Sequence, residues 1–324
     1  MGFAGGTMAS GTGRNRRWAA RAALILAALS IAVGAAAQAT APEFVGEAKC
    51  LTCHEAKNRH FSATAHARAF RANPRTALEA RVCEACHGPG SAHVANAADK
   101  SQPIRFTRES GTPIEAMNAR CLACHGGGQR QHWPDSAHSR ALVACSDCHA
   151  PMERRSAAGL LARPTINETC LACHAQQRAE FRRRSHMPVP EGKMSCADCH
   201  NPHGSTTRAA LKGDSVNETC AECHAEKRGP FLWEHAPVRE DCGTCHAPHG
   251  SNHESLLVSA RPFLCQQCHN PPIGHPGQFY AGDRTAAAAL AGGTPSPRVI
   301  GRSCQNCHSA IHGSNHPSGA RFQR

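Results

Sequence analysis

Ten copies of the pentapeptide Cys-x-x-Cys-His account for all twenty cysteines of this 324-residue chain. The pentapeptide is typical of c-type haem attachment, in which two cysteines bind the porphyrin and the histidine binds the iron. The predicted thioether cysteines are Cys50, Cys53, Cys83, Cys86, Cys121, Cys124, Cys145, Cys148, Cys170, Cys173, Cys196, Cys199, Cys220, Cys223, Cys242, Cys245, Cys265, Cys268, Cys304 and Cys307. The predicted proximal ligands are His54, His87, His125, His149, His174, His200, His224, His246, His269 and His308. Ten haem c groups make electron transfer the first predicted function.

The motif spacing suits one turn of helix, because residues i, i+3 and i+4 share a helical face. Asn-Glu-Thr precedes two motifs, at Asn167 and Asn217. Asparagine is a strong N-cap, so we expect helices to begin at these two residues. Disulfides or zinc would also use paired cysteines. Neither alternative explains why a histidine follows all ten pairs.

Residues 1–39 predict a signal peptide, with a basic start, an apolar run over 19–36 and an Ala-Gln-Ala cleavage site at 37–39. An uncleaved anchor is the alternative. No later segment approaches the roughly 20 apolar residues that a membrane-spanning helix needs. Because covalent haem attachment takes place outside the cytoplasm, the motifs and the signal agree.

The composition leaves little material for an ordinary core, since aromatic residues are only 4% of the sequence. The haem faces therefore have to supply much of the buried apolar surface, and we expect the haem-free chain to be unfolded. The formal charge of +12 falls to +8 without residues 1–39. The propionates and the positively charged oxidised haem cores together then make the sum slightly negative, so we predict no nucleic-acid binding.

A repeat of about fifty residues carries two motifs. Asn-Glu-Thr-Cys at 167–170 recurs at 217–220, and Pro-His-Gly-Ser at 202–205 recurs at 248–251. The mature domain, 40–324, is thus predicted to contain five two-haem units: 50–120, 121–169, 170–219, 220–264 and 265–324. Such arrays stack each unit on its neighbours. The predicted fold is a multihaem cytochrome c, with short α-helices and irregular loops around a linear haem array and little or no β structure.

The histidines outside the motifs are candidates for the distal iron ligands, and the repeat selects among them. The candidates are His66, His93, His138, His186, His203, His235, His249, His275, His312 and His316. Met152 stands in the second unit where the pattern expects a histidine. The tenth ligand is His316, His132 or Met152, and we prefer His316. We interpret His60 and His253 as solvent-facing residues or propionate partners.

All ten motifs end in histidine, and there are enough histidines to close every iron from both sides. A bis-histidine iron has no open position for a substrate. The pattern therefore favours electron conduction over catalysis, and no catalytic residue is predicted.

The chain resembles the DmsE/MtrA/PioA-type decahaem cytochromes. The similarity is carried by the ten motifs and their order, by the segments 220–230 and 232–237, by Cys-Gln-Gln-Cys-His at 265–269 and by the terminal segment 308–319. Met152 departs from the family pattern, which has a histidine there.

The resemblance implies a periplasmic protein that inserts into an outer-membrane β-barrel porin and carries electrons across the membrane. An inner-membrane or periplasmic cytochrome is the implied redox partner, and an outer-surface multihaem cytochrome is a further one. A polar barrel lumen suits a protein that has no lipid-facing surface of its own. The alternatives are a soluble periplasmic carrier that feeds a reductase and an enzyme that reduces a small oxyanion.

Overall fold

The computed structural model describes residues 1–2, 5–6, 41–98, 103–269, 303–317 and 319–323. The chain divides into two units, Met1–Glu43 and Phe44–Arg324. Apart from four residues, the predicted signal peptide lies outside the described residues, as does His275. No helix in the described part of the chain is both long and apolar enough to cross a bilayer.

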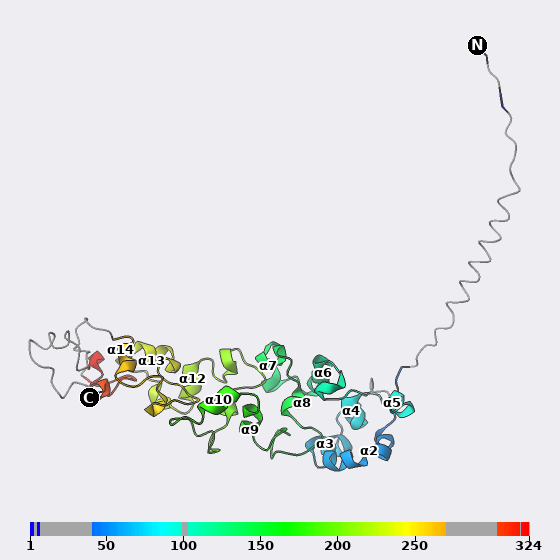
Figure 1. The fold of residues 1–324 in the computed structure, drawn as a ribbon, viewed down its shortest axis with the longest axis horizontal. Coiled ribbons are helices and arrows are strands. Elements are labelled where there is room, and N and C mark those ends of the chain that lie inside the picture. The colour runs from blue at the N-terminus through cyan, green and yellow to red at the C-terminus, as the bar shows by residue number, and fades with distance from the viewer. Residues whose placement is uncertain (3–4, 7–40, 99–102, 270–302, 318, 324) are drawn as a thin grey trace, which may run out of the picture. The chain divides into compact units, whose positions relative to one another are not determined.

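Within the unit Phe44–Arg324, short helices joined by irregular loops follow one another in chain order (Figure 1). The α-helices are α2 (Glu47–Ser62), α3 (Ala65–Ala72), α4 (Cys83–His87), α5 (Ser91–Ala95), α6 (Ile114–His125), α7 (Ala137–Arg140), α8 (Cys145–Cys148), α9 (Ile166–Leu171), α10 (Ala175–Glu180), α11 (Cys196–Cys199), α12 (Val216–Ala221), α13 (Ala236–Glu240) and α14 (Phe263–Gln266). The 3₁₀ turns are η1 (Glu79–Arg81), η2 (Arg108–Ser110), η3 (Gly128–Arg130), η4 (Trp133–Asp135), η5 (Arg208–Ala210), η6 (Ala225–Lys227), η7 (Cys242–Thr244), η8 (Glu254–Leu256), η9 (Cys304–Asn306) and η10 (Gly319–Arg321).

The described residues form no strand, and their only β pairing is in isolated antiparallel bridges. Three of these bridges recur at matching places, at His149–Leu161, His200–Leu211 and His246–Leu257. The predicted multihaem cytochrome fold of short helices and irregular loops is confirmed.

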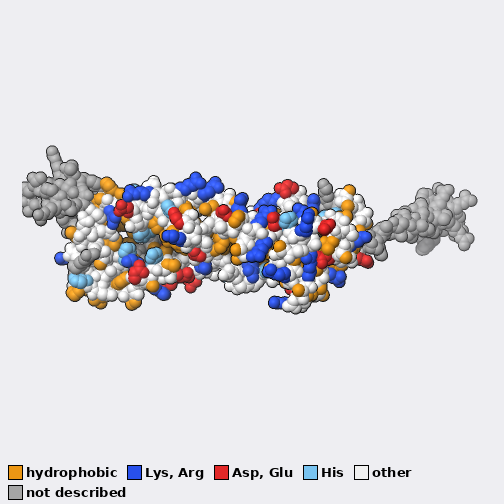
Figure 2. Space-filling model, turned by 90° about the horizontal axis from the view of Figure 1, so that it is seen from below, with side chains coloured by type: hydrophobic (Ala, Val, Ile, Leu, Met, Phe, Trp, Pro, Cys, Tyr) orange, Lys and Arg blue, Asp and Glu red, His pale blue; other side chains and the backbone are white. Residues whose placement is uncertain are grey.

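The protein core is very small. Ten described hydrophobic residues are buried, and one cluster of buried residues joins Phe61, Ala67 and Val82. On the face shown in Figure 2, hydrophobic side chains are scattered among Lys, Arg, Asp and Glu. Side-chain packing by itself therefore provides little of the apolar burial that a domain of this length needs.

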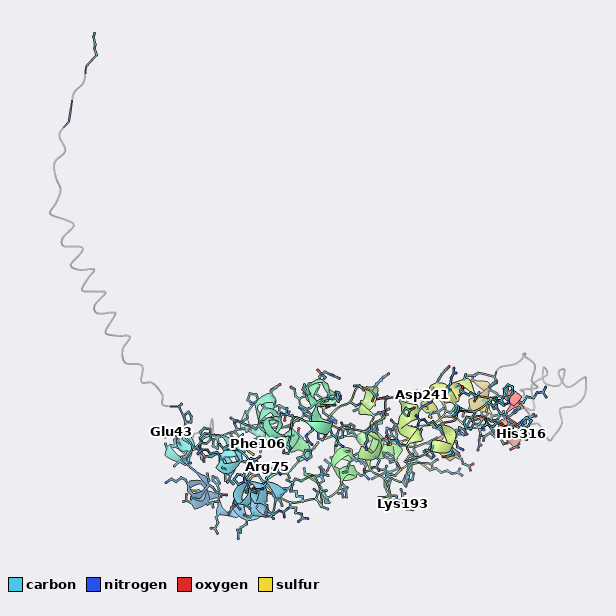
Figure 3. The ribbon with its side chains drawn as sticks, turned by 180° about the vertical axis from the view of Figure 1, so that it is seen from behind. Glu43, Arg75, Phe106, Lys193, Asp241 and His316 are labelled. Atoms are coloured by element: carbon cyan, nitrogen blue, oxygen red, sulfur yellow. The ribbon has the colours of Figure 1, made fainter. Side chains whose placement is uncertain are left out.

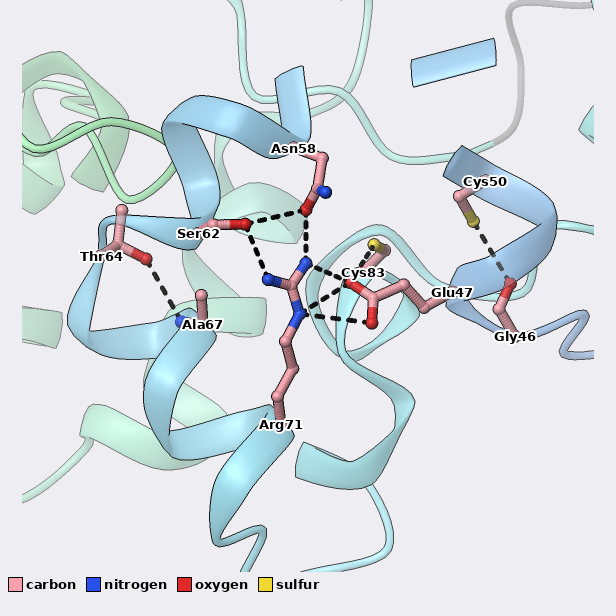
Figure 4. A network of polar contacts seen from close by, with 9 residues as sticks. All are labelled: Gly46, Glu47, Cys50, Asn58, Ser62, Thr64, Ala67, Arg71 and Cys83. Carbon is pink, nitrogen blue, oxygen red and sulfur yellow. Dashed lines mark hydrogen bonds and ion pairs between the residues drawn. The ribbon is translucent and has the colours of Figure 1, made fainter. Parts of the chain in front are cut away.

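Polar contacts join the first two helices beside the buried cluster of Phe61, Ala67 and Val82 (Figure 4). Arg71 of α3 reaches Glu47 at 2.5 Å and Ser62 at 2.8 Å, both on α2, and it also contacts Asn58. Thr64 caps α3 by accepting a hydrogen bond from the amide of Ala67. The network fixes α3 against the helix that carries the first haem motif.

The predicted helix starts at Asn167 and Asn217 are wrong. Thr165 is the N-cap of α9 and Ser215 is the N-cap of α12, so each asparagine lies inside the first helical turn. Both caps accept a hydrogen bond from a backbone amide three residues later. A hydroxyl satisfies an N-terminal amide as an asparagine would, which frees the asparagine side chain for another task.

Each of these asparagines clamps the first motif of a unit to the second. The side-chain oxygen of Asn217 accepts a hydrogen bond from the amide of Cys242 at 2.7 Å, and its amide group donates to the carbonyls of Val238 and Arg239, both at 2.9 Å. The same bond joins Asn118 to Cys145 at 2.8 Å and Asn167 to Cys196 at 3.0 Å. The clamp holds two motifs side by side over more than twenty residues of chain.

Replacing Asn217 by alanine is expected to destabilise the fourth unit. The change removes three hydrogen bonds and leaves the part-buried amide of Cys242 without its partner, at a cost of about 1–3 kcal/mol. Thermal unfolding of the haem-loaded protein should show a lower Tm, with the haem content unchanged. Asn96→Ala is the matched control, because among the described residues the side chain of Asn96 has one exposed contact, with the amide of Ala98. An equal fall in Tm for both variants would show that the hydrogen bonds of Asn217 do not stabilise the fourth unit.

Candidate haem-binding sites

The motif helices end in two ways. Helices α4 and α6 run through the motif histidine, as the spacing predicts. Helices α8 and α11 end at the second cysteine, and His149 and His200 after them have extended backbone conformations, with φ −117° and −114°. The shared helical face therefore holds for some motifs only. In the others the histidine leaves the helix and belongs to the loop that follows.

A backbone carbonyl fixes the ring of the histidine in the second motif of every unit. The Nδ1 atom of His200 lies 2.8 Å from the carbonyl oxygen of Ala209, and His246 Nδ1 lies 2.8 Å from that of Ser255. The corresponding contacts are His87 with Ile104 (2.7 Å), His149 with Gly159 (2.7 Å) and His308 with Arg321 (2.5 Å). A histidine that donates from Nδ1 presents the lone pair of Nε2 to a metal, which is the usual outer-sphere arrangement of metal-binding histidines.

The loops that supply these carbonyls are strained. Ala209 and Ala210 have φ of 63° and 52°, and Ser255 and Leu256 have φ of 56° and 59°. Non-glycine residues in the left-handed region cost of the order of 1 kcal/mol each. The strain turns a carbonyl toward the motif histidine, and sequence patterns that expect glycine at positive φ do not reveal it.

Seven motif histidines lie ring to ring with a histidine outside the motifs. In every pair the ring centroids are between 5.8 and 6.2 Å apart. The pairs are His54–His93, His125–His66, His149–His203, His174–His138, His200–His249, His246–His312 and His269–His235. The structure thus brings together seven of the ten predicted distal candidates with seven predicted proximal histidines.

The spacing of the paired rings fits a metal ion between them. An imidazole nitrogen lies about 1 Å from its ring centre and a histidine–metal bond is about 2 Å long, so two histidines on one ion have centroids about 6 Å apart. Direct hydrogen bonding would bring the rings closer. In addition, the buried Nδ1 atoms of His66, His93 and His203 have no hydrogen-bond partner among the described residues. An unsatisfied buried nitrogen is costly, so these residues fit a site that a bound group completes.

The remaining candidates lie in other surroundings. His186 is half-buried and its Nε2 atom is 3.1 Å from Glu191, while the ring of His224 is 3.7 Å from Glu226. His87 packs edge-on against Phe106 at 5.4 Å, and no other described histidine ring lies against it. Within Phe44–Arg324, His316 lies toward the opposite end from Phe106 (Figure 3).

The cysteines are close to one another but unbridged. All twenty are free thiols. The first cysteines of the two motifs in a unit interact directly: a hydrogen bond with Cys170 lowers the pKa of Cys196 to about 7, and one with Cys304 lowers the pKa of Cys265 to about 6. The same contact occurs for Cys50 with Cys83, Cys121 with Cys145 and Cys220 with Cys242. Each unit therefore places its two attachment sites edge to edge.

The second cysteines of neighbouring motifs in successive units lie near one another. Burial raises the pKa of Cys86, and the charge of Cys124 in the next unit raises it further. Equivalent neighbours, again acting after burial, are Cys148 with Cys173, Cys199 with Cys223 and Cys245 with Cys268. The two kinds of contact alternate, so the ten attachment sites follow one another in the order of the sequence.

Among the described residues, no cluster of three or more His, Cys, Asp and Glu side chains is placed to hold a metal ion. The cysteines instead line up in pairs beside histidine pairs, which is the donor set of a c-type haem.

Comparison with known proteins gives a consistent result. The family model for a doubled CXXCH motif matches residues 186–229 and 235–273. A second model, for cytochrome c-type proteins similar to NrfB, matches residues 83–161. The multiheme cytochrome MtrA of Shewanella baltica (strain OS185) is 42% identical over 279 residues, which cover 86% of this chain and 81% of that protein.

Proposed function

This chain belongs to the multihaem c-type cytochromes of the MtrA family, and from that premise we propose that it conducts electrons along ten covalently bound haems through an outer-membrane porin. The observation that carries the proposal is the chain order of the attachment sites. The first cysteines of the two motifs interact within each unit, and the second cysteines of successive units are near enough to affect each other's charge. Haem supplies one-electron chemistry, and the protein spaces and orients the haems.

In this proposal each motif contributes both its cysteines as thioethers and its histidine as the proximal ligand. The distal ligands come from the ring pairs, and they obey a rule of register. His66, His138 and His235 each face the first motif of the following unit, at His125, His174 and His269. By the same rule His186 is the distal ligand of the iron on His224. On binding that iron it loses its contact with Glu191. His275 and His316 are the candidates for the iron on His308.

A conduit that crosses a membrane inside a partner suits the chemistry of this surface. Charged side chains of both signs are spread over the face in Figure 2. Such a surface is stable in a polar lumen and not in hydrocarbon. We therefore place the mature protein in the periplasm, with a β-barrel porin around it, a periplasmic or inner-membrane cytochrome at one end and an outer-surface cytochrome at the other.

The test uses the full chain, tagged at its C-terminus and produced in a host that attaches haem c and makes the porin. The expected result is a detergent-stable complex with one barrel protein and an intact mass equal to residues 40–324 plus ten haems. A count of eight or fewer haems would contradict the attachment scheme. Complete recovery in the soluble periplasmic fraction, with no barrel, would favour a soluble carrier instead.

Electron paramagnetic resonance separates conduction from catalysis. Ten irons with two axial ligands each are expected to be low-spin in the oxidised protein. A full equivalent of high-spin iron that binds nitrite or a similar oxyanion would favour the reductase alternative.

A further inference from the structure

Four units contain the same hydrogen-bonded turn after their second motif. The amide of the fourth residue donates to the carbonyl of the first, at 3.0–3.1 Å. The turns are 150–153, 201–204, 247–250 and 310–313. In each turn the first residue also donates its amide to the strained loop, to the carbonyl of Leu160, Ala210, Leu256 or Phe322. The four turns are therefore structurally equivalent, although the sequence spacing in the last one differs by one residue.

The third residue of the turn is the one that meets a motif histidine. It is His203, His249 or His312 in three of the turns, and these face His149, His200 and His246. Each of those partners belongs to the second motif of the preceding unit. The third residue of the remaining turn is Met152.

Contacts of the fourth residue explain why the ligand goes to the preceding unit. A Cβ atom on Gly204 would lie 2.6 Å from the carbonyl oxygen of His132, and one on Gly250 would lie 2.0 Å from that of Glu180. Gly313 approaches the ring of Phe231 in the same way, at 2.1 Å. In each case the turn packs on the segment that follows the first motif of the previous unit.

The turn of Met152 packs on the equivalent segment of the first unit, with Glu153 in place of the glycine. The pKa of Glu153 is lowered, first by its hydrogen bond to Arg155 and also by His60 and Lys57 of α2. Met152 itself lines a cavity with Cys50, His54, Phe61 and Cys83. Cys83 belongs to the motif that ends in His87.

His87 is the second-motif histidine of the first unit. In the other three turns the third residue meets the second-motif histidine of the preceding unit, so the same pattern assigns Met152 to His87. Its Nδ1 is held by the carbonyl of Ile104, as in the other second motifs, yet its ring has no histidine partner among the described residues. We propose that the sulfur of Met152 is the distal ligand of the iron on His87, so that one haem of the array has Met/His ligation. This inference rests on the proposed haem scheme and deepens it.

The other candidates for this position are placed less well. His132 is the N-cap residue of η4. Its carbonyl oxygen lies against Gly204 of the third unit, and its ring contacts Gln131. His316 lies at the far end of the unit, while Phe106, which touches His87, lies at the other end (Figure 3). His60 is near the turn but exposed on α2, and nothing in the repeat has a ligand at its position.

The side chain of Met152 suits this role in two respects. It is 40% exposed, so it is not held by a core contact that ligation would have to break. A thioether is a soft, polarizable donor, and a Met/His iron has a higher potential than an iron with two histidines. The second haem of the chain is therefore expected to be reduced first among the haems of the N-terminal units.

Four variants of the full haem-loaded protein test the assignment. Oxidised wild type should show the red sulfur-to-iron charge-transfer absorption, with about one haem in ten titrating above the rest. Met152→His gives this turn the histidine that the other three turns have. It should abolish the charge-transfer absorption and lower the potential of the iron on His87, while every iron stays low-spin. Met152→Ala should convert about one iron in ten to high-spin. Met187→Leu and His60→Ala are controls and should match wild type.

The inference is overturned if wild type lacks the charge-transfer absorption, or if Met152→His leaves it unchanged. A change in His60→Ala without one in Met152→Ala would assign the position to His60. Intact mass is measured for every variant. Fewer than ten haems in wild type would contradict the proposed function itself, whereas ten haems without a methionine signal would contradict only the role of Met152.

Discussion

Without its haems the chain is expected to have no cooperative fold. The described part of the protein buries ten hydrophobic residues, and its one buried cluster is confined to the first unit, around Phe61 and Val82. That is far too little apolar burial to offset the conformational entropy of some 280 residues, which costs about 1–2 kcal/mol per residue for the backbone alone. The free energy of unfolding should fall from the usual 5–15 kcal/mol to zero or below.

The measurement uses the chain from residue 40, produced in a cytoplasm that does not attach haem c. We expect no near-ultraviolet circular dichroism, no thermal transition and no protected amides. The haem-loaded protein, measured alongside, should show all three. A haem-free chain that melts cooperatively would show that the side chains form a core that the structure does not reveal.

Replacing His249 by alanine is expected to convert about one iron in ten to high-spin and to change the potential of that haem. The ring of His249 faces that of His200 at 6.1 Å and is supported by Phe181 at 5.5 Å. Electron paramagnetic resonance of the oxidised protein measures the effect directly. His203→Ala should do the same at His149, because His203 occupies the equivalent position of the preceding unit.

His253→Ala is the control for both variants. The backbone amide of His253 donates a hydrogen bond to the hydroxyl of Ser251, and the repeat has Thr207 at the position of His253. Its replacement should leave the spectrum unchanged. A new high-spin signal in His253→Ala, together with an unchanged His249→Ala protein, would show that the distal ligand had been assigned to the wrong histidine.

The sequence predicted the haem motifs and the helical, strand-poor fold, because both are local properties. The partner of each motif histidine is not local. His149 meets His203, which lies 54 residues later and in another unit, and only the packing of one unit on the next reveals that choice. The interpretation of Asn217 as a cap failed for the same reason: Ser215 caps the helix, and the asparagine bonds to Cys242 of a different motif.

Spacing along the sequence was also a poor guide to structural equivalence. His312 lies four residues after its motif histidine and His249 lies three, yet both are the third residue of the same turn. The sequence shows a methionine at position 152 where the pattern expects a histidine, which predicts altered iron ligation in the second unit. The register of the turns places it on the first.

The handing of ligands from one unit to its neighbour has a consequence for how such chains can change length. An internal unit, such as 170–219, both gives distal ligands to its neighbours and receives distal ligands from them. A duplicated copy would therefore supply the ligands that the preceding unit needs, and the following unit would supply the ligands for its own irons. The first unit is different, since His93 folds back onto His54 within it. Under the proposed ligation, lengthening this array therefore means inserting material between existing units, whereas a unit joined to either terminus would expose irons that the present end groups close.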